Sequence, residues 1–143
     1  MLPPNHNQIN QIMKTQTITK SMDAYKVICP MIDRPEQEQA FAIYLNQANR
    51  VIEVFLLAIG SDTAVQLPTK LIVKKAILNM ATGIILAHTH PSGNVRPSEA
   101  DIKMTETVRK ACDYFDISLM DHLIISEESY YSFADGEEVA TTH

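Results

Sequence analysis

Short apolar runs, each bounded by polar or turn-forming residues, recur along the chain. This pattern is typical of β-strands. The runs lie at residues 40–45, 51–59, 83–87, 117–126 and 130–133. Only the turn-forming segment 46–50 separates the first two, so we expect these two strands to form a hairpin.

Between these runs, apolar residues recur with helical spacing. The pattern predicts a helix over residues 22–31 with Ser21 as its cap, a second helix that opens near Pro68, and a third over residues 98–115. The apolar residues expected on one side of the third helix are Ile102, Val108, Cys112 and Phe115. Strands interleaved with helices favour an α/β fold, and we expect one domain with a mixed central β-sheet flanked by helices.

The two ends of the chain are polar. Residues 1–19 are rich in Asn, Gln and Thr, which predicts a flexible N-terminal arm, and residues 138–143 are expected to form a C-terminal tail. Residues 20–137 then form the domain. The start has no signal-peptide pattern and no apolar run is long enough to cross a bilayer, so we expect a cytoplasmic protein without a membrane partner.

Charge and cysteine content narrow the choice of partners. The chain of 143 residues has a net charge of −5, which opposes strong direct binding of nucleic acid because phosphate contacts need clustered Lys and Arg. Its small groups of lysines are expected to be solvated helix faces. Cys29 and Cys112 lie in apolar stretches and are expected to be buried free thiols. The sequence leaves the oligomeric state open.

The candidate chemistry lies in the segment HTHPSGNVRPSEAD, residues 88–101. His88 and His90 are two residues apart at a strand end, so both imidazoles can point to the same side. Asp101 falls in the first turn of the next helix and can be aimed back at them. Two nitrogens, one oxygen and room for a water form the ligand set of a catalytic zinc site. Spacing alone leaves an alternative open, in which Ser98 and Asp101 only cap the helix.

Other metal and nucleotide motifs are missing from the sequence. It has no H-E-x-x-H, no Walker loop and no dinucleotide fingerprint. A zinc nucleobase deaminase would need H-x-E and P-C-x-x-C, but His90 occupies the place of that glutamate and the second motif does not occur.

Part of the segment 88–101 resembles the core of the JAMM (MPN+) metallopeptidase motif. The matching positions are His88-x-His90-Pro91, then Ser98 after six residues, then Asp101 after two more. The longer runs HTHPSGNVRPSEAD, LMDHLIIS and YYSFADG are similar to the RadC family in particular, over about residues 20–137. The resemblance implies a JAMM/MPN-type fold with cytidine-deaminase-like topology. RadC proteins often carry a helical segment upstream, so this chain resembles the stand-alone short form.

The same resemblance implies a function and residue roles. The chain would be a zinc-dependent hydrolase of peptide or isopeptide bonds, with His88, His90 and Asp101 as zinc ligands and a water in the fourth position. Zinc would lower the pKa of that water and polarise the scissile carbonyl. Ser98 would donate a hydrogen bond to the developing oxyanion. A glutamate from an earlier strand would act as general base.

The general base is where the chain departs from the family pattern. In many RadC sequences the glutamate stands two positions before an aromatic residue of the strand; if Phe41 is that aromatic, the position holds Gln39. Glu38 is next to it but would point to the other face of a regular strand, so a bulge or a later strand start would be needed to bring it into the site. Glu53 is a remoter candidate.

Two further questions stay open, the role of an Asp-His pair and the function of the domain. Asp121 and His122 match an Asp-His pair of the family. One of them is expected to orient a ligand histidine, or both form a buried hydrogen-bonded pair. The alternative function is a catalytically weak or inactive zinc-binding module that acts in DNA maintenance or mobile-element biology through protein partners. The label of the family links it to DNA repair, but no residue chemistry in the sequence does.

Overall fold

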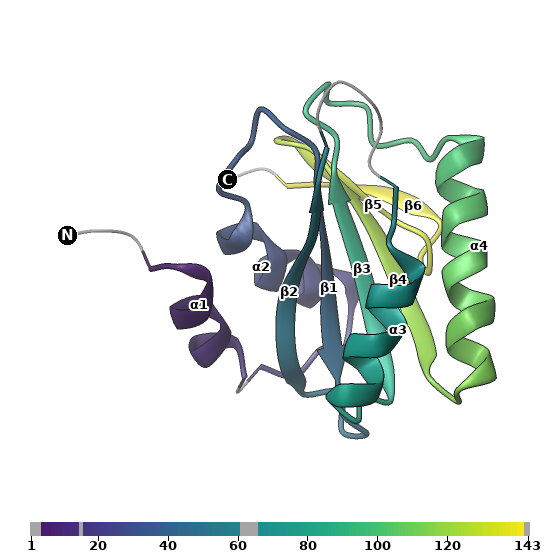
Figure 1. The fold of residues 1–143 in the computed structure, drawn as a ribbon. Coiled ribbons are helices and arrows are strands. Elements are labelled where there is room, and N and C mark those ends of the chain that lie inside the picture. Colours follow the sequence, from purple (N-terminus) through teal and green to yellow (C-terminus); the bar gives the residue numbers. More distant parts are fainter. Residues whose placement is uncertain (1–3, 15, 61–65, 142–143) are drawn as a thin grey trace.

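The computed structural model describes residues 4–14, 16–60 and 66–141 (Figure 1). Its helices are α1 (His6–Met13), α2 (Ser21–Ile28), the 3-10 turn η1 (Cys29–Met31), α3 (Thr69–Leu78) and α4 (Glu99–Tyr114). Its strands are β1 (Gln39–Leu45), β2 (Val51–Ile59), β3 (Gly83–Thr89), β4 (Ser118–Ile125), β5 (Ser129–Ser132) and β6 (Glu137–Ala140).

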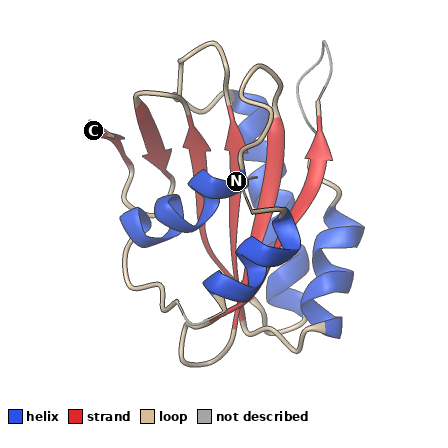
Figure 2. Cartoon of the chain, turned by 90° about the vertical axis from the view of Figure 1, so that its left-hand side faces the viewer, coloured by secondary structure: helices blue, strands red, loops and turns tan. Residues whose placement is uncertain are grey.

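The strands form one mixed six-stranded sheet in the order β2-β1-β3-β4-β5-β6. Strands β1 and β2 form the expected antiparallel hairpin, β1 is also antiparallel to β3, and β3 and β4 are parallel. Helices α1 and α2 lie in front of the sheet in Figure 2, and α3 and α4 lie behind it. The prediction of an α/β domain with a mixed sheet flanked by helices is therefore confirmed.

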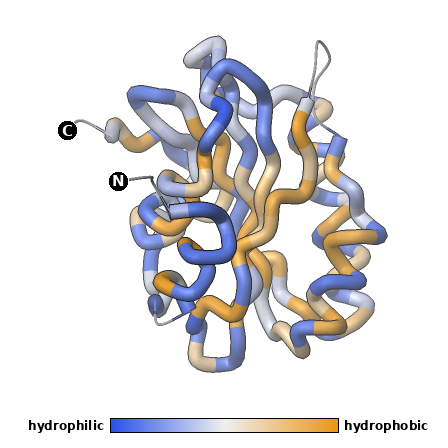
Figure 3. Tube along the Cα trace, turned by 60° about the vertical axis from the view of Figure 1, so that its left-hand side comes forward, coloured by the Kyte–Doolittle hydropathy of each residue, from blue (hydrophilic) through white to orange (hydrophobic). Residues whose placement is uncertain are grey.

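The alternation of side chains divides β1 and β3 between two hydrophobic clusters. Phe41 and Ile43 pack in the cluster formed with α1 and α2, whereas Ala42 and Tyr44 pack in the cluster formed with α3 and α4. Ala40 is the register partner of His88, so even-numbered residues at this end of both strands face α4. The loops above this end are mostly hydrophilic, and the strands below them are hydrophobic (Figure 3).

The helices differ in detail from the expectation. Ser21 is the first residue of α2 and not its cap; the carboxylate of Asp23 accepts the Lys20 N–H instead. On α4 the buried residues include Val108 and Cys112 as expected, but Ile102 and Phe115 are 53% and 51% exposed. Among the described residues, no helix is long and apolar enough to cross a bilayer.

Cys112 is buried, as expected, whereas Cys29 is exposed and its thiol donates to the Tyr25 hydroxyl. The expectation of two buried thiols is therefore wrong for Cys29, which follows α2 directly and lies in η1 rather than on the buried side of a longer helix. Both cysteines are free.

The ends of the chain are more ordered than the polar composition predicts. Within the segment 1–19, α1 buries Ile9, and Thr17 forms a β-bridge with Arg50. At the other end, β6 pairs with β5 where a tail was expected. The remaining parts of the two predicted terminal segments, residues 1–3, 15 and 142–143, lie outside the described residues.

The side chain of Asn10 explains why α1 packs on the sheet. Its amide donates to the Val54 carbonyl at 2.8 Å and accepts the Val54 N–H at 2.6 Å. These two bonds satisfy backbone groups of β2, which is an edge strand, in the way that a neighbouring strand would.

We expect Asn10→Ala to lower the free energy of unfolding by about 1–2 kcal/mol, because two hydrogen bonds to the edge strand are lost. Urea titration followed by far-UV circular dichroism measures the change. Asn7→Ala is the matched control, since Asn7 is an exposed residue of the same helix and should change stability little. Equal stabilities of the two variants would show that α1 does not depend on this contact.

Candidate metal centre

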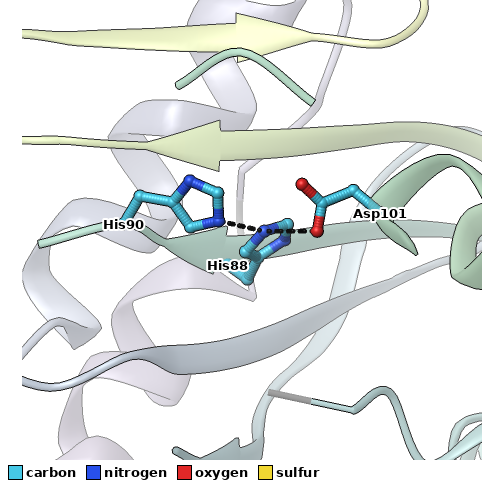
Figure 4. A group of neighbouring side chains, drawn as sticks. All are labelled: His88, His90 and Asp101. Atoms are coloured by element: carbon cyan, nitrogen blue, oxygen red, sulfur yellow. Dashed lines mark hydrogen bonds and ion pairs between the residues drawn. The ribbon is translucent and has the colours of Figure 1, made fainter. Parts of the chain in front are cut away.

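The carboxyl end of β3 and the first turn of α4 bring His88, His90 and Asp101 together (Figure 4). His88 is the second-last residue of β3, and the His90 N–H donates to the Ile125 carbonyl at 2.8 Å, so the chain continues alongside β4 beyond the strand end. The two imidazoles therefore point to the same side. The sequence prediction that these three residues meet is confirmed.

Two distances within the cluster are close to the spacing of ligands around one ion, and all three ligand atoms lie within 4.8 Å of one another. His88 Nε2 lies 3.0 Å from His90 Nε2 and 3.5 Å from Asp101 Oδ1. Two ligand atoms bound at about 2.0–2.1 Å in tetrahedral geometry would lie about 3.3 Å apart. The group can therefore hold a metal ion after only small adjustments of the side chains.

A capping box aims the Asp101 carboxylate. The Ser98 hydroxyl accepts the Asp101 N–H at 3.1 Å, and Asp101 Oδ2 accepts the Ser98 N–H at 2.8 Å. One carboxylate oxygen is thus held by the helix N-terminus, which leaves Oδ1 directed at His88. The cap and the candidate ligand, which the sequence presented as alternatives, are one arrangement.

The tautomer of His90 follows from its loop contact. His90 Nδ1 lies 2.7 Å from the Asn94 carbonyl oxygen, which can only accept, so Nδ1 carries the proton and neutral His90 has its lone pair on Nε2. This lone pair and the carboxylate oxygen of Asp101 both approach His88 Nε2. Such a convergence needs a hydrogen atom or a cation between the acceptors, supplied either by neutral His88 with its proton on Nε2 or by a metal ion.

A second proton on His88 is costly. The residue is 3% exposed, and burial, with a smaller contribution from His90, lowers the pKa of His88 to about 4 against the opposing effect of Asp101. At neutral pH His88 is therefore not doubly protonated. A neutral imidazole is the form that binds metal ions.

Sequence reasoning left the role of the Asp121–His122 pair open, and in the structure the two side chains have different partners. His122 Nε2 lies 2.7 Å from His88 Nδ1. Asp121 instead accepts hydrogen bonds from the His122 N–H, the Ser132 hydroxyl and the Ala134 N–H, so it holds β4 to β5 and the turn after it.

Sequence reasoning missed Thr105, whose hydroxyl lies 2.6 Å from His122 Nδ1. Thr105 stands four residues after Asp101, one helical turn along the same face of α4. That spacing was the only signal in the sequence that Thr105 faces the metal cluster. It could be used only once His122 was known to lie next to this face of α4.

Three residues were considered for the general base, and the structure describes the contacts of each. The Gln39 side chain is buried away from the cluster, where it donates to Asp33 Oδ1 at 2.8 Å and accepts the Arg34 N–H. Glu53 is paired with Lys75 at 2.9 Å and accepts a bond from Asn79. Glu38 precedes β1 by one residue, is partly buried, and its carbonyl accepts the Gly60 N–H.

A mixed α/β domain with a His-x-His strand end facing an Asp in the next helix is a JAB/MPN-type domain. Comparison with protein families gives a match to the RadC-like JAB domain over residues 18–139. The chain belongs to this family.

Individual relatives agree with this assignment. The chain is 39% identical over 124 residues to a UPF0758 protein of Flavobacterium johnsoniae and 40% identical over 126 residues to one of Porphyromonas gingivalis, in each case over 87% of this chain. A UPF0758 protein of Streptococcus agalactiae is 34% identical over 126 residues, or 88% of this chain. The matches cover 54%, 56% and 55% of the relatives, so the chain spans about half their length.

The buried histidines predict acid-labile folding of the metal-free protein. The pKa values of His88 and His122 are lowered in the folded state, so between pH 6.5 and about 4 the unfolded chain binds more protons than the folded chain. Stability should fall as pH falls through this window, by roughly 3 kcal/mol from His88 alone.

Urea unfolding at several pH values, with a chelator present, measures this dependence. In His88→Gln the slope between pH 6.5 and 4.5 should be smaller than in the wild type. An unfolding free energy that stays constant over this interval in the wild type would contradict the assignment of neutral buried histidines.

Proposed function

We propose that the domain is a zinc-dependent hydrolase of peptide or isopeptide bonds. The observation that carries the proposal is the convergence of His88 Nε2, His90 Nε2 and Asp101 Oδ1, three acceptor atoms within 4.8 Å of one another. Two imidazoles and one carboxylate, with a fourth position left for water, are typical of catalytic zinc rather than structural zinc. When bound, zinc would supply a hydroxide at neutral pH and polarise the carbonyl of the substrate.

Glu38 is the proposed general base. It stands two residues before Ala40, whose register partner is His88, and residues two apart on an extended chain share a face. If the extended conformation of β1 continues to Glu38, its side chain would lie on the side of the sheet that carries His88, without a bulge. The contacts of Gln39 support the same choice, because its amide is held by Asp33 and by the Arg34 N–H.

Ser98 is the proposed donor to the oxyanion of the tetrahedral intermediate. Its hydroxyl oxygen accepts the Asp101 N–H, which uses a lone pair and leaves the hydroxyl proton for another acceptor. Ser98 is also exposed, so a substrate can reach it. The capping role and the catalytic role are therefore compatible in one side chain.

A cavity beside His90 supports a chain-like substrate. It has a volume of about 440 Å³, and its lining includes Tyr25, Ile32, Pro35, His90 and Ile125. Mostly apolar walls that include His90 would suit a peptide side chain next to the scissile bond. We also propose a cytoplasmic location, in keeping with two free thiols, and expect no strong direct binding of nucleic acid.

The first test is metal content. Purified protein after dialysis should hold close to one zinc per chain, and His88→Ala combined with His90→Ala should abolish binding because two of three ligands are lost. Elemental analysis gives the ratio. His6→Ala is the control, since His6 lies on α1 and contacts Met31 and Asp33 instead. Zinc retained by the double variant would contradict the site.

The second test separates Glu38 from Gln39. Glu38→Gln should lower the hydrolysis rate by about 10²–10⁴-fold, the usual contribution of a positioned base. Gln39→Glu should give no gain, because the new carboxylate would face Asp33, whose Oδ1 lies 2.8 Å from the Gln39 amide nitrogen. The rates are measured with a panel of fluorogenic peptide and isopeptide conjugates.

Glu36→Gln is the matched control, since Glu36 is exposed in the loop before β1. A rate increase in Gln39→Glu, with no effect of Glu38→Gln, would reverse the assignment. Equal rates for the wild type, both variants and the zinc-free protein would remove the hydrolase proposal. The alternative from the sequence, a zinc-binding module that acts through protein partners in DNA maintenance, would then remain.

A further inference from the structure

We propose that Thr105 is a positioning residue for the metal centre, acting through His122 to hold His88 with its Nε2 lone pair directed at the ion. This inference rests on the proposed zinc site. It concerns a buried chain of hydrogen bonds that runs from the ligand histidine back to the helix that carries the ligand aspartate.

The chain has three links of short length. His88 Nδ1 lies 2.7 Å from His122 Nε2, His122 Nδ1 lies 2.6 Å from the Thr105 hydroxyl, and that hydroxyl lies 2.7 Å from the carbonyl oxygen of Asp101. His88, His122 and Thr105 are 3%, 0% and 3% exposed, so water cannot readily replace a missing partner. The His122 ring is also stacked on Phe133, with 4.9 Å between centroids and 11° between planes, which restrains its orientation.

A cation on His88 Nε2 sets the direction of every proton. Neutral His88 then carries its proton on Nδ1 and donates to His122 Nε2. His122 must in turn carry its proton on Nδ1 and donate to the oxygen of Thr105. Thr105 has one proton left, which it donates to the Asp101 carbonyl, so all three bonds are made and the chain ends on the backbone of another ligand.

The opposite direction conflicts with the site. If Thr105 donated to His122 Nδ1, His122 would carry its proton on Nε2 and donate to His88 Nδ1. Neutral His88 would then carry its own proton on Nε2, the atom that must bind the metal. The Thr105 oxygen and the Asp101 carbonyl oxygen would also face each other at 2.7 Å without a proton between them. The donation of Thr105 to the carbonyl four residues before it thus favours the direction that leaves Nε2 open.

The test uses zinc affinity, measured by competition with a chromogenic chelator. Thr105→Val keeps the shape of the side chain but removes the acceptor of the His122 Nδ1 proton, and we expect zinc binding to weaken by about 10–100-fold. Thr105→Ser should restore affinity, because it keeps the hydroxyl. Thr107→Val is the matched control, since Thr107 is exposed on the same helix and donates to the Lys103 carbonyl in the same way.

A second readout needs no variant. Long-range proton–nitrogen NMR of the zinc-loaded wild type should show His122 protonated at Nδ1; protonation at Nε2 would overturn the proposal, including in the case that Thr105→Val fails to fold. Unchanged zinc affinity in folded Thr105→Val would overturn it as well. A wild type that binds no zinc would instead contradict the proposed function, so the two failures are distinguishable.

Discussion

The site depends on one electrostatic constraint, the approach of three hydrogen-bond acceptors at a largely buried strand end. His90 is fixed in one tautomer by the Asn94 carbonyl, Asp101 is fixed by the capping box, and both approach His88 Nε2 within 3.5 Å. Burial makes the doubly protonated form of His88 unfavourable, with a pKa lowered to about 4. The neutral His88 imidazole that results is the form that can bind a metal ion, and the proposed zinc ion would lie between the three groups.

The fold contributes by placing these groups before any ion arrives. β3 lies between β1 and β4, and all of its residues are buried, so the position of His88 is determined by neighbours on both sides. The first turn of α4 is fixed by its capping box, and the Thr105–His122 contact holds the helix to β4, the neighbour of β3. This preorganisation is expected to raise the affinity for a metal ion. It also makes the metal-free fold sensitive to acid, because its histidines are buried in the neutral form.

The pattern of apolar residues was enough to predict the mixed sheet and the β1–β2 hairpin, and the spacing of His88, His90 and Asp101 together with the RadC resemblance predicted their cluster. Sequence reasoning was less successful where one residue of register matters. Neighbouring residues of a strand point to opposite faces, so the choice between Glu38 and Gln39 turns on the register, in which Ala40 pairs with His88. The rotation of α4, which exposes Ile102 and Phe115, and the packing of α1 through Asn10 depend on tertiary contacts that composition does not encode.

Membership in the RadC-like JAB domain family establishes the kind of domain, whereas the chemistry proposed for it depends on what faces the fourth position of the metal. A crystal structure of the zinc-loaded protein tests this point most directly. We expect zinc bound to His88 Nε2, His90 Nε2 and Asp101 Oδ1, with a water in the fourth position and the Glu38 carboxylate within hydrogen-bond distance of that water. Zinc bound elsewhere, or a site in which Gln39 rather than Glu38 contacts the water, would contradict this expectation.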